Sequence, residues 1–252
     1  MAKEMRKYGL IGQSLGYSFS KDFFTNKFQK ENINATYENF ELDRIEDFKT
    51  LLAQEPNLKG LNVTIPYKEE IIQFLHDLCP IAKEIGAVNT IAIQNDKLIG
   101  YNTDVYGFQQ SIKPFLRNVH ERALILGTGG ASKAVAYVLH KLGIDVCYVS
   151  RYPRGENQFS YNDVNELMID AFRLIINCTP IGTFPDVTVT PNIPLNYFTS
   201  DHLIIDLIYN PNKTALLKAA SSKGAETMNG YSMLQHQALR AWGKWKDSEM
   251  QL

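Results

Sequence analysis

Residues 122–143 read RALILGTGGASKAVAYVLHKLG, and this stretch decides the fold class. The run ALILG is typical of a buried strand, and ASKAVAYVLHKLG has the apolar spacing of a helix. The turn between them holds Gly127, Gly129, Gly130 and Ala131. Glycines in such a turn let the backbone approach a diphosphate, whose charge then lies against unpaired N–H groups at the helix start. The stretch therefore predicts a dinucleotide-binding turn. The alternative is a tight turn that binds no ligand.

The segment after the next strand predicts which dinucleotide is bound. Residues 144–149 read IDVCYV, and the following SRYPR contains Ser150, Arg151 and Arg154. An Asp or Glu at this end of the strand would accept a hydrogen bond from a ribose hydroxyl, but neither is present in SRYPR. Two arginines suit a 2′-phosphate instead, so we predict NADP rather than NAD. As ordinary surface side chains they would carry no such preference.

Strands and helices alternate outward from this unit through most of the chain. The runs RLIINC and HLIIDLIY follow it, and the first hundred residues give KYGLIG, TYENFEL and LKGLNVTI between helical segments. This alternation predicts an α/β fold in two blocks with mainly parallel sheets, whose ligands gather at the carboxyl ends of the strands. Residues 102–119 predict a joining helix capped by Asn102 or Thr103, and residues 184–199, rich in Pro, Asn and Thr, predict a loop.

Composition excludes several classes of partner. The 252 residues carry a formal net charge of −1 and a pI near 6.5, so no overall field attracts nucleic acid or an anionic membrane. No apolar run approaches the roughly 20 residues that span a bilayer, and we expect no targeting leader. Cys79, Cys147 and Cys178 lie in separate apolar segments, which favours reduced thiols and a cytoplasmic location. The five histidines show no metal-binding spacing.

Two charged residues are candidates for acid–base chemistry. Residues 62–68 read NVTIPYK, and the pattern predicts a helix that begins at Pro66 and has Lys68 in its first turn. The positive end of a helix disfavours an ammonium group, so a lysine there is biased toward releasing its proton. Asp104 is predicted in the first turn of the joining helix, where a carboxylate could steady the lysine. The alternatives are a surface lysine and an aspartate that only complements a helix dipole.

Other polar residues interrupt apolar patterns. Ser18 and Ser20 precede a helix predicted from about residue 21 to 32, where they could bind a carboxylate or, for Ser20, cap the helix. Gln237 lies in the apolar stripe of the C-terminal helix, where it either hydrogen-bonds within the core or reaches a ligand. Asn89 and Tyr209 stand beside strand ends, where an ordinary loop role is the alternative.

An ordered set of strings resembles the shikimate dehydrogenase family over nearly the whole chain. The strings are NVTIPYK, GAVNT, GYNTD, GTGGASKA, SRYPR, NCTPIG, DLIYNP and GYSMLQHQA. The resemblance implies NADP-dependent, reversible reduction of 3-dehydroshikimate to shikimate on the route to chorismate and the aromatic amino acids. It also implies a substrate-binding α/β domain (residues 1–103 with 236–252) and a Rossmann-type NADP domain (residues 104–235).

The resemblance assigns roles residue by residue. Lys68 and Asp104 match the family's catalytic pair. The substrate-binding matches are Ser18 and Ser20 for the carboxylate, and Thr64, Asn89, Tyr209 and Gln237 around the ring. The cofactor-binding matches are Gly127, Gly129, Gly130, Ala131, Ser150, Arg151, Arg154, Thr179, Gly230 and Met233. Three positions depart from the family pattern: Tyr17 and Lys21 replace a His and a Pro, and Thr183 replaces a common Met.

Three other functions are compatible with parts of the pattern. A quinate/shikimate dehydrogenase would accept quinate and often NAD, and a folate-linked dehydrogenase also pairs a lysine-bearing domain with a Rossmann unit. A metabolite sensor would keep the pocket without the chemistry. In each case the partner is a small molecule, and the chain is expected to be a monomer or a homodimer.

Overall fold

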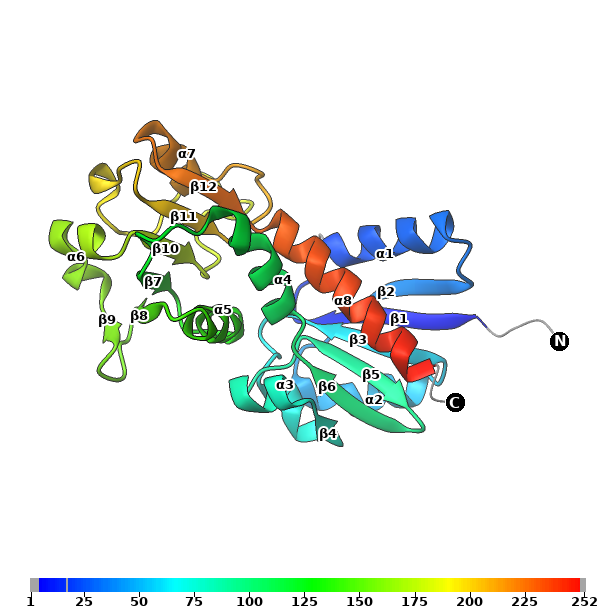
Figure 1. Cartoon of the computed structure of the whole chain (residues 1–252). Coiled ribbons are helices and arrows are strands. Elements are labelled where there is room, and N and C mark those ends of the chain that lie inside the picture. Colours follow the sequence, from blue (N-terminus) through cyan, green and yellow to red (C-terminus); the bar gives the residue numbers. More distant parts are fainter. Residues whose placement is uncertain (1–4, 17, 250–252) are drawn as a thin grey trace. The chain divides into compact units, whose positions relative to one another are not determined.

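A computed structural model describes residues 5–16 and 18–249, and the predicted departure at Tyr17 lies outside them. The chain forms two compact units, residues 1–106 with 237–252 and residues 107–236, called here the first and second units. Both boundaries fall inside helices, α4 (Asp104–Ile112) and α8 (Tyr231–Glu249). The chain is coloured along its length in Figure 1.

The first unit is built on a six-stranded sheet with the order β2-β1-β3-β5-β6-β4. Its strands are β1 (Arg6–Gly12), β2 (Ala35–Glu41), β3 (Leu58–Val63), β4 (Asp77–Leu78), β5 (Thr90–Gln94) and β6 (Lys97–Tyr101). Its other helices are α1 (Phe19–Lys30), α2 (Phe48–Gln54) and α3 (Pro80–Ile85). The pairs β1–β2, β1–β3 and β4–β6 are parallel, whereas β5 runs antiparallel to β3 and β6. The antiparallel pair follows from a two-residue turn at Asn95 and Asp96, where both φ angles are positive.

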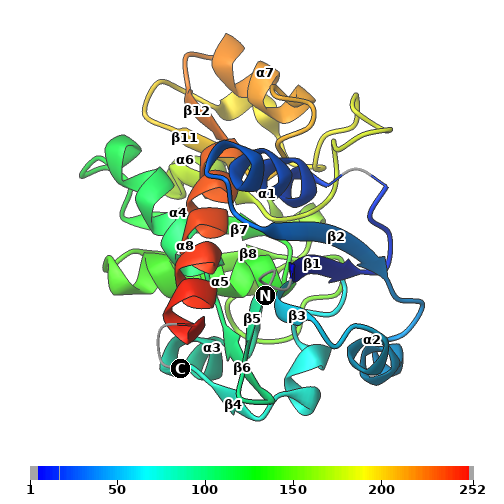
Figure 2. The ribbon, with the colours of Figure 1, turned by 90° about the vertical axis from the view of Figure 1, so that its right-hand side faces the viewer.

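Both faces of this sheet are covered by helices (Figure 2). Side chains alternate across a strand, so Tyr8 and Leu10 face one core while Ile11 faces the other. Helices α1 and α8 pack over the first core, and α2 and α3 contribute to the second.

The C-terminal end of α8 packs against the sheet of the first unit through Trp245. The Trp245 indole stacks on Tyr8, with ring centroids 4.8 Å apart, and its Nε1 donates to Ile91 O at 2.9 Å. A β-carbon at Gly60 would collide with this indole.

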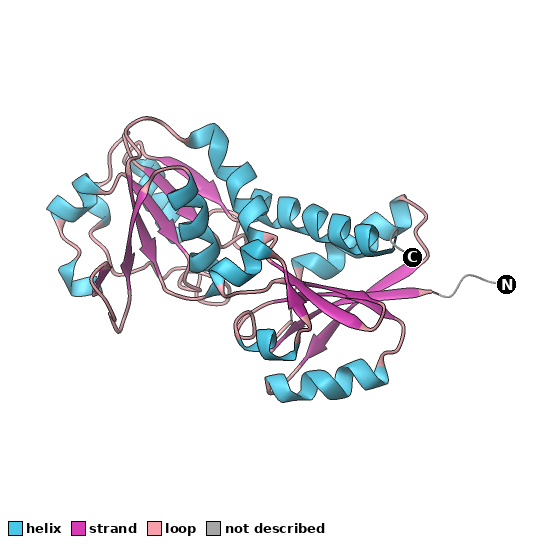
Figure 3. Ribbon diagram, turned by 60° about the horizontal axis from the view of Figure 1, so that its bottom comes forward, coloured by secondary structure: helices cyan, strands magenta, loops and turns pink. Residues whose placement is uncertain are grey.

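The second unit is a parallel sheet with the order β12-β11-β10-β7-β8-β9. Its strands are β7 (Arg122–Leu126), β8 (Asp145–Val149), β9 (Gln158–Phe159), β10 (Leu174–Asn177), β11 (Leu203–Asp206) and β12 (Glu226–Asn229). Its helices include α5 (Gly130–Lys141), α6 (Glu166–Ala171) and α7 (Ala215–Ser222). In Figure 3 helices are cyan and flank the magenta strands. Strands β10 and β11 are buried throughout, as expected for a sheet covered on both faces. The strand order reverses beside β7, where such folds bind their ligands.

Short 3₁₀ helices complete the chain. They span Ile45–Asp47, Glu70–Phe74, Lys113–Phe115, Tyr161–Asp163 and Leu195–Tyr197. The last of these lies in the predicted loop at 184–199, which otherwise consists of turns and irregular segments.

The predicted helix at Pro66 is wrong. Residues 65–69 form turns, and only the 3₁₀ helix Glu70–Phe74 follows. The Lys68 carbonyl accepts from Val88 N at 2.7 Å instead of from a following helical N–H, and the buried Tyr67 donates its hydroxyl to Leu42 O at 2.6 Å. At Lys68 a tertiary contact thus replaces the helical hydrogen bond, and Lys68 lies in a turn instead of the first turn of a helix.

Ser18, and not Ser20, caps α1. Ser18 has extended backbone angles, and its hydroxyl accepts from Lys21 N at 3.2 Å, so the helix begins at Phe19 rather than near residue 21. Ser20 is buried within the first turn. At α4, the Asn102 side chain accepts from Val105 N at 3.3 Å, which confirms one of the two predicted caps.

Within residues 5–16 and 18–249, no helix is long and apolar enough to cross a membrane. In the same ranges no cluster of three His, Cys, Asp or Glu could hold a metal ion. Cys79, Cys147 and Cys178 form no disulfide.

Candidate active site

Lys68 and Asp104 form a close ion pair in the first unit. Lys68 Nζ lies 2.6 Å from Asp104 Oδ2, and the two side chains are 15% and 7% exposed. Lys68 comes from the turn after β3, and Asp104 is the first residue of α4. A charged hydrogen bond of this length, mostly removed from water, is stronger than a surface ion pair.

Asn89, which follows a turn and precedes β5, fixes the orientation of the Asp104 carboxylate. Its Oδ1 accepts from Thr103 N at 2.6 Å, so its Nδ2 points the other way and donates to Asp104 Oδ1 at 2.8 Å. Both carboxylate oxygens therefore accept hydrogen bonds, one from an amide and one from an ammonium group. Gln237 joins the cluster from α8, since its Oε1 accepts from Asn89 Nδ2 at 3.4 Å and from Thr103 Oγ1 at 3.5 Å.

A buried relay of hydrogen bonds extends the cluster across the sheet. Tyr37 donates its hydroxyl to Asn62 Oδ1 at 2.8 Å, and Asn62 Nδ2 donates to Thr90 Oγ1 at 3.2 Å. Thr90 Oγ1 lies 3.2 Å from Asn89 Oδ1 and 3.1 Å from Thr103 Oγ1. Burial raises the pKa of the Tyr37 phenol, opposed by a hydrogen bond with Ser20, so the phenol stays a neutral donor. This relay holds the amide groups of the cluster in one orientation.

Sequence reasoning missed Asn62 and Thr90 as site residues, and it considered Thr103 only as a helix cap. Each lies inside a string quoted above, NVTIPYK, GAVNT or GYNTD, and each is nearly fully buried. The available signal for these residues was a polar side chain near the end of a buried strand. Their hydrogen-bond partners lie far away in the sequence, so the sequence of one strand does not reveal them.

The remaining predicted substrate residues are spread over both units. Ser18 uses its hydroxyl as the α1 cap, Ser20 is linked to Tyr37, and half-buried Thr64 follows β3 with its N–H donating to Ile11 O at 2.9 Å. These three belong to the first unit with the ion pair. Tyr209 belongs to the second unit, where it is half-buried three residues after β11.

The predicted glycine turn of the second unit has the geometry of an anion site. Gly127 has φ of +102°, a conformation that favours glycine, and Gly129 precedes α5 without a side chain that could cap it. Gly130 and Ala131 form the first turn of α5. Ser132, at the third glycine position of the motif, is buried and donates its hydroxyl to Gly129 O at 2.6 Å, so it fits where a glycine is usual.

The predicted phosphate clamp lies after β8. Ser150 accepts a hydrogen bond from Tyr152 N at 3.2 Å, and the Arg154 N–H donates to Gln158 Oε1 at 2.9 Å. Both Arg151 and Arg154 are exposed. The backbone of this loop is therefore braced while its two cations face solvent.

Three further cofactor candidates surround the same sheet edge. Thr179 follows β10, and a β-carbon at Gly127 would lie 3.0 Å from its Cγ2. Gly230 lies against the Leu207 carbonyl, where any side chain would collide, and Met233 is buried in the first turn of α8.

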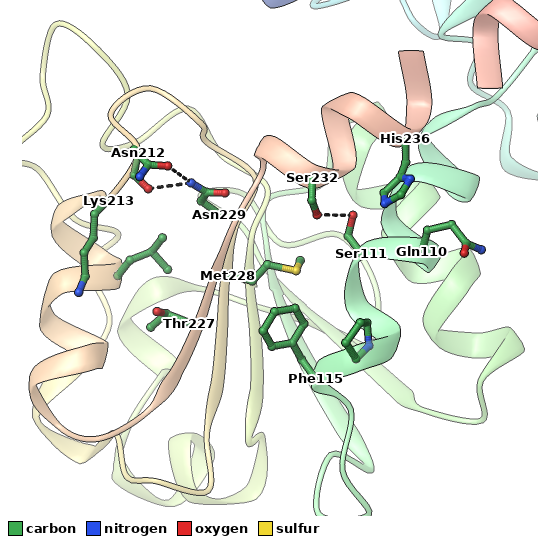
Figure 4. Close-up of a pocket in the computed structure, with 12 residues that line it drawn as sticks. Gln110, Ser111, Phe115, Asn212, Lys213, Thr227, Met228, Asn229, Ser232 and His236 are labelled. Atoms are coloured by element: carbon green, nitrogen blue, oxygen red, sulfur yellow. Dashed lines mark hydrogen bonds between the residues drawn. The ribbon is translucent and has the colours of Figure 1, made fainter. Parts of the chain in front are cut away.

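A pocket of about 600 Å³ in the second unit contains none of the predicted residues. Figure 4 shows its polar contacts, in which Ser232 donates to Ser111 Oγ at 2.7 Å and Asn229 Nδ2 donates to Asn212 O at 2.8 Å. Phe115 and Met228 supply apolar lining. Nothing on its walls matches the chemistry predicted from the sequence.

Comparisons with known proteins show which proteins this chain is similar to. The profile of the "Shikimate dehydrogenase substrate binding domain" matches residues 10–91. A "Shikimate dehydrogenase (NADP(+))" from Clostridium botulinum (strain Hall) is 42% identical over 247 residues, covering 94% of this chain and 95% of that protein.

Solved structures show the same similarity. Shikimate dehydrogenase 1 from Peptoclostridium difficile has a TM-score of 0.84 and 34% identity, covering 96% of this chain and 92% of that chain. The Thermus thermophilus enzyme, solved in complex with NADP(H) and shikimate, has a TM-score of 0.83 and 29% identity, covering 96% and 93%. The ion pair, the glycine turn and a relative matched over nearly its whole length agree, and the chain belongs to the shikimate dehydrogenase family.

Proposed function

We propose that this chain interconverts 3-dehydroshikimate and shikimate with NADP, with Lys68 and Asp104 as the acid–base pair. When bound, NADPH would supply a hydride for the carbonyl carbon; the C=O π electrons would move to oxygen, and a proton from Lys68 would complete the hydroxyl. The products are shikimate and NADP⁺. The 2.6 Å contact between Lys68 and Asp104 carries the proposal, because it holds a proton donor and its counter-ion in a site largely shielded from water.

We infer separate roles for Lys68 and Asp104, supported by their hydrogen bonds. Asp104 accepts at both carboxylate oxygens, from Asn89 and from Lys68, so it acts here as an anion. Lys68 is then the group that gives its proton to the developing alkoxide and takes it back in the oxidative direction. Asp104 holds the ammonium group in position and stabilises its charge.

The other predicted residues receive binding roles. Ser18 and Ser20 are proposed to bind the substrate carboxylate, and Thr64, Asn89 and Gln237 to hold its ring, with Tyr209 contributed by the second unit. Gly127, Gly129, Gly130, Ala131 and Thr179 would hold the diphosphate and its surroundings, and Gly230 and Met233 the nicotinamide. Ser150, Arg151 and Arg154 would bind the 2′-phosphate, since a guanidinium group matches phosphate oxygens in a bidentate way.

We propose that one domain binds the substrate and the other binds the cofactor. Residues 1–103 with 236–252 would bind substrate, and residues 104–235 would bind NADP. We also propose a cytoplasmic location, action as a monomer or homodimer, and no nucleic-acid partner, because the net charge of −1 supplies no attracting field.

One assay tests the activity. The purified chain is mixed with shikimate and NADP⁺, and the absorbance of the reduced nicotinamide is followed. Parallel reactions replace NADP⁺ by NAD⁺ and shikimate by quinate. We expect the largest kcat/KM with shikimate and NADP⁺. A larger value with quinate or NAD⁺ would identify a quinate/shikimate dehydrogenase, and binding of both ligands without turnover would identify a sensor.

A further inference from the structure

Asp206, at the carboxyl end of β11, is a buried acid outside the predicted site. The residue is 0% exposed. Its Oδ1 accepts from Asn177 Nδ2 at 3.0 Å and from Ile208 N at 3.2 Å, and its Oδ2 accepts from Thr214 Oγ1 at 2.7 Å. Three donors, one from the end of β10 and two from residues 207–214, therefore converge on one carboxylate.

One branch leads to the glycine turn. Asn177, the last residue of β10, uses its Oδ1 to accept from Thr179 N at 3.0 Å and from Thr179 Oγ1 at 2.6 Å. Its Nδ2 also donates to Ile181 O at 3.3 Å. Because the Thr179 methyl group lies against Gly127, the position of the turn depends on the orientation of the Asn177 amide, which Asp206 fixes.

The second branch leads to the segment that carries Tyr209. Asp206 accepts from Ile208 N, next to Tyr209, and from Thr214, which caps α7 by accepting from Leu217 N at 3.3 Å. Residues 207–214 are thus held at both ends by the same side chain. Thr183 Oγ1 donates to Asn210 O at 3.3 Å and ties this segment to the one after Thr179.

Burial of the charged Asp206 carboxylate disfavours the folded state. Burial raises the pKa of Asp206 to about 6, opposed by the hydrogen bonds from Thr214, Ile208 and Asn177. A group that is expensive to bury, placed beside ligand-binding loops, fits a functional rather than a stabilising role.

We propose that Asp206 is a positioning residue that holds the Thr179 segment and the Tyr209 segment together in their ligand-binding geometry. The inference rests on the binding roles proposed above for Thr179 and Tyr209. Asp206 itself touches neither reacting group: it acts through Asn177 on the nucleotide side and through the backbone at Ile208 on the substrate side.

The test is Asp206→Asn, which keeps the size of the side chain but puts an NH₂ group where an acceptor is needed. The dissociation constant of NADP⁺ is measured by calorimetry, and KM and kcat are measured with shikimate. We expect the dissociation constant and the KM for shikimate each to rise about 10-fold, as they would if the binding geometry were populated about a tenth of the time. We expect kcat at saturation to change less than about threefold, because ligand binding then restores the geometry.

His202→Asn is the matched control. His202 is equally buried and precedes β11 at its opposite end, where its Nε2 lies 3.0 Å from Ile169 O. This variant should lower the melting temperature but leave the NADP⁺ dissociation constant unchanged. Thr214→Ser, which keeps the donor to Asp206, should behave like the unaltered chain in both assays.

The outcomes separate the two proposals. Unchanged NADP⁺ and shikimate constants in Asp206→Asn, in a preparation whose unaltered chain is active, would overturn the positioning role. An equal loss of affinity in His202→Asn would overturn it as well, because general destabilisation would then explain both. Absence of turnover in the unaltered chain would instead contradict the proposed function.

Discussion

At the scale of single residues, the site is an ordered set of donors and acceptors more than a set of charges. Asn89 shows this best, because its Oδ1 accepts from Thr103 N and its Nδ2 must therefore face Asp104. The Lys68–Asp104 contact could be predicted from the strings NVTIPYK and GYNTD. The orientation of the Asn89 side-chain amide could not. Its cause is a backbone N–H fourteen residues away, and no local pattern records that contact.

Replacing Lys68 by Ala should lower kcat by about 10² to 10⁴, the usual contribution of a positioned acid or base. NADP⁺ affinity should stay close to that of the unaltered chain, because the residues proposed to bind NADP lie in the second unit. Steady-state kinetics and calorimetry measure the two effects. Lys59→Ala, on an exposed position of β3, is the control and should retain activity. A fully active Lys68→Ala enzyme would remove the lysine from the mechanism.

Thr90 offers a test of the buried relay. Thr90→Val removes the hydroxyl that passes the orientation of Asn62 to Asn89 and Thr103, so kcat should fall about tenfold. Thr90→Ser restores the hydroxyl and should recover most of the activity. If the serine variant were as impaired as the valine variant, the methyl group and not the hydrogen bond would be responsible.

The titration of Asp206 predicts a pH dependence of stability. Its pKa of about 6 in the folded chain is above the ordinary value of 3.8, so the folded state holds the proton more tightly than the unfolded state. The resulting contribution is present below about pH 4 and is lost as the pH rises through about 6, a total of about 3 kcal/mol. Urea unfolding of the unaltered chain and of Asp206→Asn across this range gives the difference. If the difference between the two free energies of unfolding does not vary with pH, the shift is absent.

At the scale of elements, the sequence predicted best the strands, turns and helices whose structure depends on neighbouring residues. Strand β7, the glycine turn and α5 follow from an apolar run, three glycines and a helical period within one stretch. The helix expected at Pro66 does not form, because contacts with distant residues decide the structure there. Val88 N donates to the Lys68 carbonyl, and the Tyr67 ring is buried in the core. The hairpin of β5 and β6 was also missed as an antiparallel pair, although its two-residue turn was in the sequence.

Two glycines near α8 should respond oppositely to alanine. At Gly230 a β-carbon would collide with the Leu207 carbonyl, so Gly230→Ala should displace the start of α8 and lower the melting temperature. At Gly243, inside α8, a β-carbon meets nothing within 4 Å. Gly243→Ala should therefore stabilise the chain by about 0.5–1 kcal/mol, the helix preference of Ala over Gly. Thermal unfolding measures both, and a neutral Gly230→Ala would show that the backbone there relaxes freely.

At the scale of the whole molecule, each unit has its own apolar core and the two unit boundaries lie within helices. The α/β class and the two blocks were predictable from the alternation of strands and helices. The division of α8 between the two units does not follow from its apolar stripe, because the stripe does not say which sheet it covers; only the family resemblance grouped residues 236–252 with residues 1–103.

Cofactor binding should therefore protect the two units unequally. NADP⁺ at about 100 times its dissociation constant stabilises the unit that binds it by about 2.7 kcal/mol. Hydrogen exchange in β10 and β11 should slow accordingly, while the urea midpoint reported by Trp242 and Trp245, both in the first unit, should move less. Equal shifts at both reporters would mean that the units unfold as one.

The contact between Gly60 and Trp245 has an evolutionary consequence. Because a β-carbon at position 60 and an indole at position 245 cannot occupy the same space, position 60 cannot gain a side chain while Trp245 is present. Lineages that acquire a side chain at position 60 must first have shrunk the aromatic group near the end of the chain. The order of those two changes in a reconstructed ancestry should run in that direction only.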